Sequence, residues 1–599
     1  RGAEGHGDVK ITSDAKSDIA PFNVNLVGIG FNVGIGDVKS YVDVDDSTIT
    51  SAKDTTLSAE GTNAVKMSLI DFSAVPMGGL SLDFSWAQLT SDIAAKVGEK
   101  ATLVSQGDVD ISAKSIRSLG SSASNCGQTL GLSVGLGISD TKASADMAGT
   151  VYAKGDVSVK AENTLSENGG VYAADTVTAS SIGGDTALKP TTDPIKAGVG
   201  KFFSKLKKAF TEEDKTGQAA KDLDLDKADK PAKQKKPWNK MGANASTALL
   251  FSDNDATASV TGKVRGIDAS GNASEAAGAK SLTVDALTLS RSHAVVGSYQ
   301  NDTTVSKDET TKKDNTITAA ISYLEQRNHA TAFISGDTKT SGDTTVHAKT
   351  VIPWQTSWQS TDPVDQLLNV FFASIDTNPV LPDLVDSWTQ AAGNGDNVNG
   401  AASVSIVNYD NNAKAYIGKK DDTQTTTPTV DAAGNVNVTG ETDITTVNLT
   451  GTIQSYLSAA PLNLWKTAYK NKEKKLAFED IFNRNGWTMD GASKAGVGGA
   501  VLSVHQKNNA EAYIDDGAVV TAKGSADASA KARALNIAMA AAGGPAKSVA
   551  VDATVGVNRF DNTTKARIGN ATVTAKDVSV TAEDLSKTIQ AAGASRVSG

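Results

Sequence analysis

Short segments in which apolar and polar residues alternate recur along most of the chain. A block of the form Gly-Asp-Val-x-Val-x-Ala occurs, with small variations, at 107–113, 155–161, 434–439 and 576–582. Alternation with a period of two predicts a half-buried β-strand. The Gly-Asp or Gly-Asn pair before the strand predicts a turn, because these residue types tolerate left-handed backbone angles.

A second block has the form Asn-x-Ala-x-Ala-x-Ile, with Val in place of Ile in one copy. Its copies begin at Asn254, Asn328, Asn411, Asn508 and, in a variant form, Asn562. The asparagine comes before the alternation, which predicts a second turn residue. Residues two apart share one face of a strand, so the last alanine and the final β-branched residue should point into a narrow core. These pairs are Ala258 and Val260, Ala332 and Ile334, Ala415 and Ile417, Ala512 and Ile514, and Ala566 and Ile568.

One unit of strand, turn and strand is too small to bury its own apolar face, and stacked copies would bury it. The sequence therefore predicts an all-β fold, a right-handed parallel β-helix (β-solenoid) with α-helical insertions. The solenoid is expected over 1–186, 244–350, 401–451 and 493–599. Copies recur after 50 residues between Val97 and Met147 and after 54 between Ile514 and Ile568. At roughly 20 residues a coil, each such repeat would supply two or three coils, and the rod would be about 100 Å long.

Three segments depart from the repeat and are predicted to be helical insertions, at 187–243, 351–400 and 452–492. Apolar residues at helical spacing, such as Phe203, Leu206 and Phe210, support this assignment. Insertions in repeat proteins often bind partners. The alternative is that their aromatic residues form small cores of their own or cover the solenoid. The candidate partner-binding residues are Trp354, Trp358, Trp388, Trp465 and Trp487.

Composition removes several function classes. A net charge of −10 opposes nucleic-acid binding, and a single cysteine excludes disulfides and cysteine-based zinc sites. The five histidines show no metal-binding spacing, and no P-loop or transmembrane segment is present. Stacking could align Asp108, Asp156 and Asp577 in one column, but turn chemistry explains them. The sequence predicts no catalytic residue, no cofactor and no metal, although a polysaccharide-active β-helix enzyme stays an alternative.

The two blocks resemble those of leukotoxin-type filamentous adhesins, which are giant proteins exported by bacteria through a type V route. The resemblance covers most of the chain outside the three insertions. It implies a long β-helical fibre at the outer cell surface or outside the cell. Because the shared motif is structural, no catalytic residue carries over.

The expected function is therefore that of a non-enzymatic filamentous adhesin. Its expected partners are a receptor or glycan on a host or neighbouring cell, or copies of itself. A self-assembling filament subunit and a cytotoxin are alternatives. Since Gly7–Ile11 matches the Gly-Asp-Val block with no Asn-x-Ala-x-Ala-x-Ile block before it, the chain is expected to be a piece of something longer or one unit of a polymer.

Overall fold

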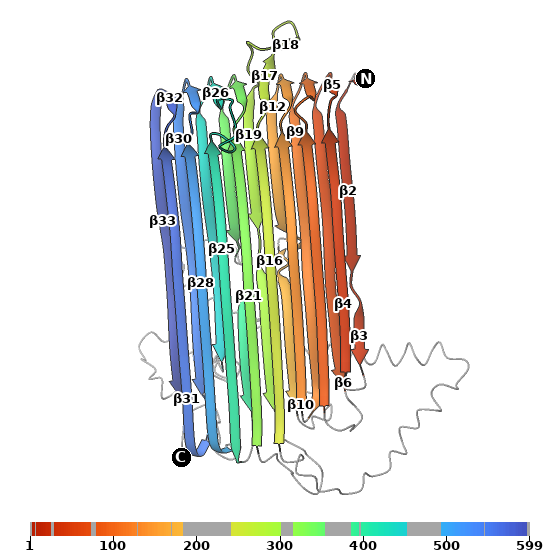
Figure 1. Ribbon diagram of the computed structural model, residues 1–599, viewed down its shortest axis with the longest axis vertical. Coiled ribbons are helices and arrows are strands. Elements are labelled where there is room, and N and C mark those ends of the chain that lie inside the picture. Colours follow the sequence, from red (N-terminus) through yellow and green to blue (C-terminus); the bar gives the residue numbers. More distant parts are fainter. Residues whose placement is uncertain are drawn as a thin grey trace, which may run out of the picture.

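The chain forms a stack of parallel β-strands (Figure 1). The computed structural model describes residues 3–5, 7–25, 29–72, 80–128, 130–168, 171–183, 241–300, 315–353, 385–393, 397–451, 493–543 and 546–595. None of these residues is helical, and only two short strand pairs are antiparallel. The predicted all-β parallel solenoid is confirmed.

Each coil has three faces: a first long face, a short face and a second long face. In one coil these are β25 (Val398–Ile417), β26 (Thr429–Ala432) and β27 (Val436–Gly451). The first long face also contains β4 (Ile29–Val44), β7 (Leu80–Val97), β10 (Leu130–Met147), β16 (Met241–Val260), β21 (Asn315–Ile334), β28 (Ser493–Ile514) and β31 (Ala546–Ile568).

The other strands of the stack complete the remaining two faces. The short face also contains β1 (Ala3–Gly5), β5 (Thr48–Ser51), β8 (Thr102–Ser105), β11 (Thr150–Ala153), β17 (Lys263–Ile267), β22 (Asp337–Thr340), β29 (Val519–Ala522) and β32 (Thr572–Thr574), and β18 (Ala273–Ser274) pairs with β17. The second long face also contains β2 (Val9–Ile19), β3 (Phe22–Asn25), β6 (Thr55–Phe72), β9 (Val109–Gln128), β12 (Asp156–Leu165), β15 (Asp175–Gly183), β19 (Ser281–Leu289), β20 (Ser292–Gln300), β23 (Thr344–Ile352), β24 (Ser387–Gly393), β30 (Ser525–Gly543) and β33 (Asp577–Ser595). A separate small pair joins β13 (Glu167–Asn168) to β14 (Val171–Tyr172).

One repeat is one coil, which corrects the predicted coil length. Val97 pairs in register with Met147, and Ile514 pairs with Ile568, so each pair occupies neighbouring layers. The long strands explain the difference, since β4 has 16 residues and β31 has 23. Twenty residues extend to roughly 65 Å, whereas eight strands stack to only about 40 Å. The predicted rod of about 100 Å is wrong, and the strands run along the longest axis of the molecule (Figure 1).

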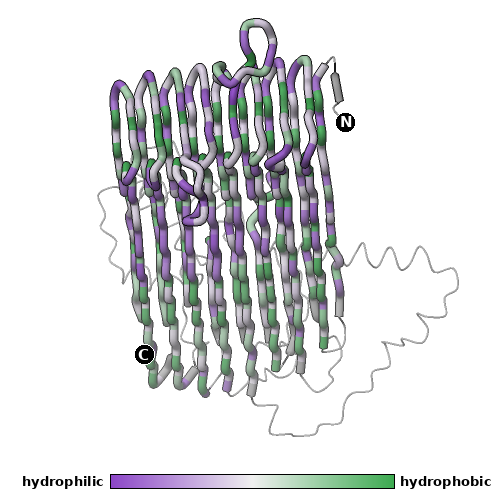
Figure 2. The backbone as a smooth tube through the Cα atoms, turned by 45° about the horizontal axis from the view of Figure 1, so that its top comes forward, coloured by the Kyte–Doolittle hydropathy of each residue, from purple (hydrophilic) through white to green (hydrophobic). Residues whose placement is uncertain are grey.

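The interior alternates between apolar and polar bands. Along long strands such as β10 and β25, every second residue is buried, and apolar and polar residues intermingle along the backbone (Figure 2). A near cluster beside the short face includes Val260, Ile334 and Ile417. A far cluster, towards the opposite end of the long strands, includes Leu250 and Leu324.

The predicted inward pairs are confirmed. The four alanines Ala258, Ala332, Ala415 and Ala512 are fully buried, as are their β-branched partners Val260, Ile334, Ile417 and Ile514. Ala566 and Ile568, in the last coil described, pack against the same cluster but are only partly buried.

The predicted helical insertions are not seen. Residues 241–243 begin β16, 351–352 end β23, 387–393 form β24 and 398–400 begin β25, so the boundaries of the first two insertions were wrong there. The aromatic and proline content of 351–400 hid a strand that pairs in parallel with β20 and β27. Apart from residues 353, 385–386 and 397, the rest of the proposed insertions lies outside the described residues.

Candidate functional site

The repeated asparagines form a ladder through the interior. They lie within the strands of the first long face, between the near and far clusters, and not at turns as predicted. Each side-chain amide donates from Nδ2 to Oδ1 of the asparagine in the next coil. The distances are 2.9 Å from Asn254 to Asn328, 2.7 Å from Asn328 to Asn411, 2.9 Å from Asn411 to Asn508 and 2.9 Å from Asn508 to Asn562.

This asparagine ladder gives the Asn-x-Ala-x-Ala-x-Ile block a structural role, because it joins neighbouring coils. An amide both donates and accepts, so a column of amides can satisfy itself inside a dry core. Thr141 occupies the same column one coil earlier, and its hydroxyl donates to Asn254 Oδ1 at 3.0 Å. The inward direction was predictable from the period of two, because four of the five asparagines stand two residues before a buried alanine.

A buried ion pair lies in the same interior. Arg117 on β9 and Asp175 on β15 are both fully buried, with Nε 3.1 Å from Oδ2. The guanidinium also donates to Asn163 Oδ1 at 2.6 Å. This network fixes the place where the second long face divides into β12 and β15. The sequence signal for this ion pair was Arg117, a charged residue at an inward position of an alternating strand.

The turn aspartates form a second column, and the register places Asp108, Asp156 and Asp577 at the same turn of their coils, as predicted. Asp54 Oδ1 accepts from the backbone N–H of Asp108 at 2.8 Å, and Asp108 Oδ1 accepts from that of Asp156 at 2.8 Å. Hydrogen bonds from Lys280 and Ser281 lower the pKa of Asp156. These carboxylates join coils and do not converge on a common point.

The glycines before Asp108 and Asp156 are required by close approach. A Cβ at Gly155 would lie 2.0 Å from Asp108 Oδ1, and one at Gly107 would lie 2.0 Å from Asp54 Oδ1. Neither glycine has a positive φ. The left-handed conformation assumed from the sequence was therefore the wrong reason for these glycines.

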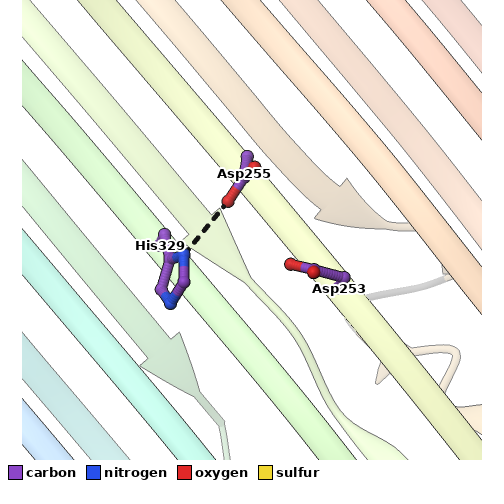
Figure 3. Close-up of side chains that lie close together, drawn as sticks. All are labelled: Asp253, Asp255 and His329. Carbon is purple, nitrogen blue, oxygen red and sulfur yellow. Dashed lines mark ion pairs between the residues drawn. The ribbon is translucent and has the colours of Figure 1, made fainter.

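Two carboxylates and an imidazole meet on the outer side of the first long face (Figure 3). Ligand atoms of Asp253, Asp255 and His329 all lie within 4.8 Å of one another. His329 Nδ1 is 3.3 Å from Asp255 Oδ1, and this hydrogen bond raises the pKa of His329. Arg327 Nη1 lies 3.9 Å from Asp253 Oδ2. Because these bases already face the carboxylates, the cluster is explained by ion pairing.

A polar cleft, here called the tyrosine cleft, opens beside the short face. It has a volume of about 470 Å³ and is lined by Tyr416, Tyr513 and Arg567 on three successive strands, with Lys419–Asp422 and Asp515–Gly517 from the loops. The Tyr416 ring stacks on Phe333 with centroids 4.9 Å apart and planes at 5°. The Lys414 ammonium lies 4.9 Å from the Tyr416 centroid, and the Arg567 guanidinium lies 5.0 Å from that of Tyr513.

The cleft combines flat aromatic surfaces with charges of both signs. Burial raises the pKa of Tyr416 to about 12, so this hydroxyl stays a neutral donor at physiological pH. Arg567 pairs with the buried carboxylate of Asp515. Such a site can hold a polyhydroxylated ligand by hydrogen bonds to the Tyr416 hydroxyl and the charged side chains. Sequence reasoning missed the cleft, although the outward residue between each inward pair is Phe333, Tyr416 or Tyr513 in three successive copies.

Of the five candidate tryptophans, only Trp388 is described. It lies in β24, is 4% exposed and packs with Leu449, Val447 and Ile537. It is therefore a packing residue and not a surface for partners. Trp354, Trp358, Trp465 and Trp487 lie outside the described residues.

Comparison of the chain with protein families, curated proteins and solved structures gives no match. Among the residues that the structure describes, there is no helix of the length and apolarity needed to cross a membrane.

Proposed function

We propose that this chain is a non-enzymatic structural segment of an extracellular bacterial adhesive fibre. The observation that carries the proposal is the asparagine ladder together with the turn aspartates. Both networks join neighbouring coils by hydrogen bonds that recur in several layers, so a further coil can be added without a new kind of core. A binding surface on such a scaffold is a column of outward side chains, repeated at strand spacing.

The aligned carboxylates argue against the enzyme alternative. A polysaccharide-active site needs carboxyl groups that face one groove and can exchange protons with a substrate. Asp108 and Asp54 instead accept backbone hydrogen bonds at each turn.

The tyrosine cleft is the receptor-binding region in this proposal. The hydroxyl of Tyr416 and the lysines, arginine and aspartates that line the cleft suit the hydroxyl or acidic groups of a sugar. The ligand class is thus a cell-surface glycan.

Binding of the purified chain to a panel of immobilised glycans and to host cells tests both statements. We expect binding that falls about tenfold or more in Tyr416→Ala and is unchanged in Tyr41→Ala, an outward tyrosine on β4. If Tyr416→Ala kept full binding, the cleft would be excluded as the glycan-binding site. Absence of glycan and cell binding, or cleavage of a polysaccharide, would overturn the adhesive function.

A self-assembling filament subunit is the second candidate. Val578 and Val580 in β33 are 52% and 48% exposed, although their register partners Ala526 and Ala528 in β30 are buried. Another coil stacked on β33 would bury them. Negative-stain microscopy separates the candidates, because only the filament subunit gives long fibres from the purified chain.

A further inference from the structure

The outer side of the first long face carries an apolar surface on the half that lies away from the short face. One column of this surface runs through Phe31, Ile321, Val501 and Val555, and the register connects all eight strands along it. Phe31 is 70% exposed and Val555 is 49% exposed. A second column, two residues further along each strand, runs from Val33 to Val557. We call these two columns and their apolar neighbours on the same half the apolar half-face.

No charged residue interrupts either of these two columns in the described strands. Soluble monomers rarely expose a continuous apolar patch of more than a few hundred Å². Eight strands at ~4.8 Å and about eight residues at ~3.3 Å give roughly 1,000 Å². Exposure on this scale indicates an interface.

We propose that the apolar half-face is a dimer interface, covered by the same half-face of a second copy of this chain. The surface is a broad sheet of regular outward side chains, and a second sheet can pack on it at ~10 Å with interdigitating side chains. The area of roughly 1,000 Å² per copy exceeds the ~800 Å² per partner of a standard stable interface.

The charged half of the same outer side supports this partner. The aspartates Asp37 and Asp43 lie on β4, whereas Arg559 and Lys565 lie on β31. A two-fold axis parallel to the strands keeps the apolar half-faces together and reverses the order of the coils in the partner. The reversed order sets β4 of one copy, with its two aspartates, opposite β31 of the other, with its basic residues, which favours this pairing over alternatives.

A membrane surface fits this face less well. Binding to anionic lipid requires basic residues around the apolar patch, and β16 presents Asp253 and Asp255 there. The dimer does not depend on the glycan-binding proposal, because the tyrosine cleft uses residues beside the short face.

Sedimentation equilibrium of the whole chain over a range of concentrations tests the proposal. We expect the dimer mass for the parent and an affinity at least about tenfold weaker for Ile321→Lys/Ile406→Lys. Both side chains point outward, so the variant should keep its circular dichroism spectrum and melting temperature. Thr345→Lys/Asn437→Lys, which adds the same two charges to the second long face, should dimerise like the parent.

Several outcomes would overturn the interface. A parent chain that stays monomeric at every concentration would do so. A dimer that persists in Ile321→Lys/Ile406→Lys would place the contact elsewhere. A monomer that co-sediments with vesicles of neutral phosphatidylcholine would assign the face to lipid.

Discussion

The two halves of each long strand are built differently. In the near half, beside the short face, several corners are tight: Ala148 and Gly149 alone join β10 to β11. In the sequence, residues 184–240 separate the far-half ends of β15 and β16, and residues 452–492 separate those of β27 and β28. Both recurring sequence blocks belong to the near half. The Asn-x-Ala-x-Ala-x-Ile block ends strands of the first long face, and the Gly-Asp-Val block begins strands of the second long face.

The outer surfaces differ in the same way. Near-half side chains of the first long face form ion pairs such as that between Lys507 and Asp410. Far-half side chains of the same strands are apolar and exposed. The near half thus holds the coils together by repeated local chemistry, whereas the far half supplies the surface that we assign to a second copy.

The largest effect is expected from a charge inside the near cluster. Ile417→Asp places a carboxylate at a fully buried position in the middle of the stack. Burial of an unpaired charge should cost on the order of 4–5 kcal/mol or more, enough to unfold the neighbouring coils. Limited proteolysis and urea denaturation measure this loss.

Ile406→Asp is the matched control, because Ile406 lies on the same strand but points outward in the far half. It should fold like the parent. An Ile417→Asp protein as protease-resistant as the parent would show that Ile417 does not face the core.

The next effect concerns the ladder that separates the two clusters. Asn411→Ala removes the hydrogen bonds to Asn328 and Asn508 and leaves a donor and an acceptor buried without their partners. The expected loss is about 2–4 kcal/mol in the free energy of unfolding, measured in urea. Asn562→Ala, in the partly exposed last coil, should lose less. Equal losses at both positions would mean that burial does not set the strength of the ladder.

A smaller effect is expected at the tight corners. Gly155→Ala forces a Cβ against Asp108 Oδ1, whereas a Cβ at Gly499, in a far-half strand, would meet nothing within 4 Å. We expect Gly155→Ala to lose about 1–3 kcal/mol and Gly499→Ala to change stability by less than about 1 kcal/mol. Asp108→Ala should partly rescue Gly155→Ala in a double-mutant cycle. Additive losses would contradict a clash between these two residues.

The same division explains what the sequence could predict. The period of two and the copies of Ala-x-Ile were sufficient to predict the near-half strands and their inward residues. They were also sufficient to predict the alignment of Asp108 with Asp156. The far half has no repeated block, so the full length of strands such as β21 was not visible and one coil was taken for two or three. Each asparagine of the ladder bonds to a partner 54 to 97 residues away in the sequence. The spacing of residues within one block does not reveal such a partner. The tyrosine cleft likewise forms only when neighbouring coils bring Tyr416 and Tyr513 side by side.

The smallest effect distinguishes the two halves by pH. His347 lies on the outer side of β23 in the near half, 2.8 Å from Asp285 and 3.8 Å from Glu441. Partial burial lowers its pKa, but hydrogen bonds to these two carboxylates outweigh burial and raise the pKa to about 9. His293 in the far half is buried against the carbonyl of Val385, and this burial lowers its pKa to about 4.

These opposite shifts give opposite pH dependences. The raised pKa of His347 stabilises the fold fully below pH 6.5, and that stability is lost as pH rises through about 9. The lowered pKa of His293 favours the fold above pH 6.5, and that stability is lost as pH falls through about 4. After allowance for the partial exposure of His347, its contribution should be about 1–2 kcal/mol. Urea midpoints measured across this range should lose their alkaline decline in His347→Gln and part of their acid decline in His293→Gln. An alkaline decline that persists unchanged in His347→Gln would show that the three side chains on the near half do not act as a pH-linked group.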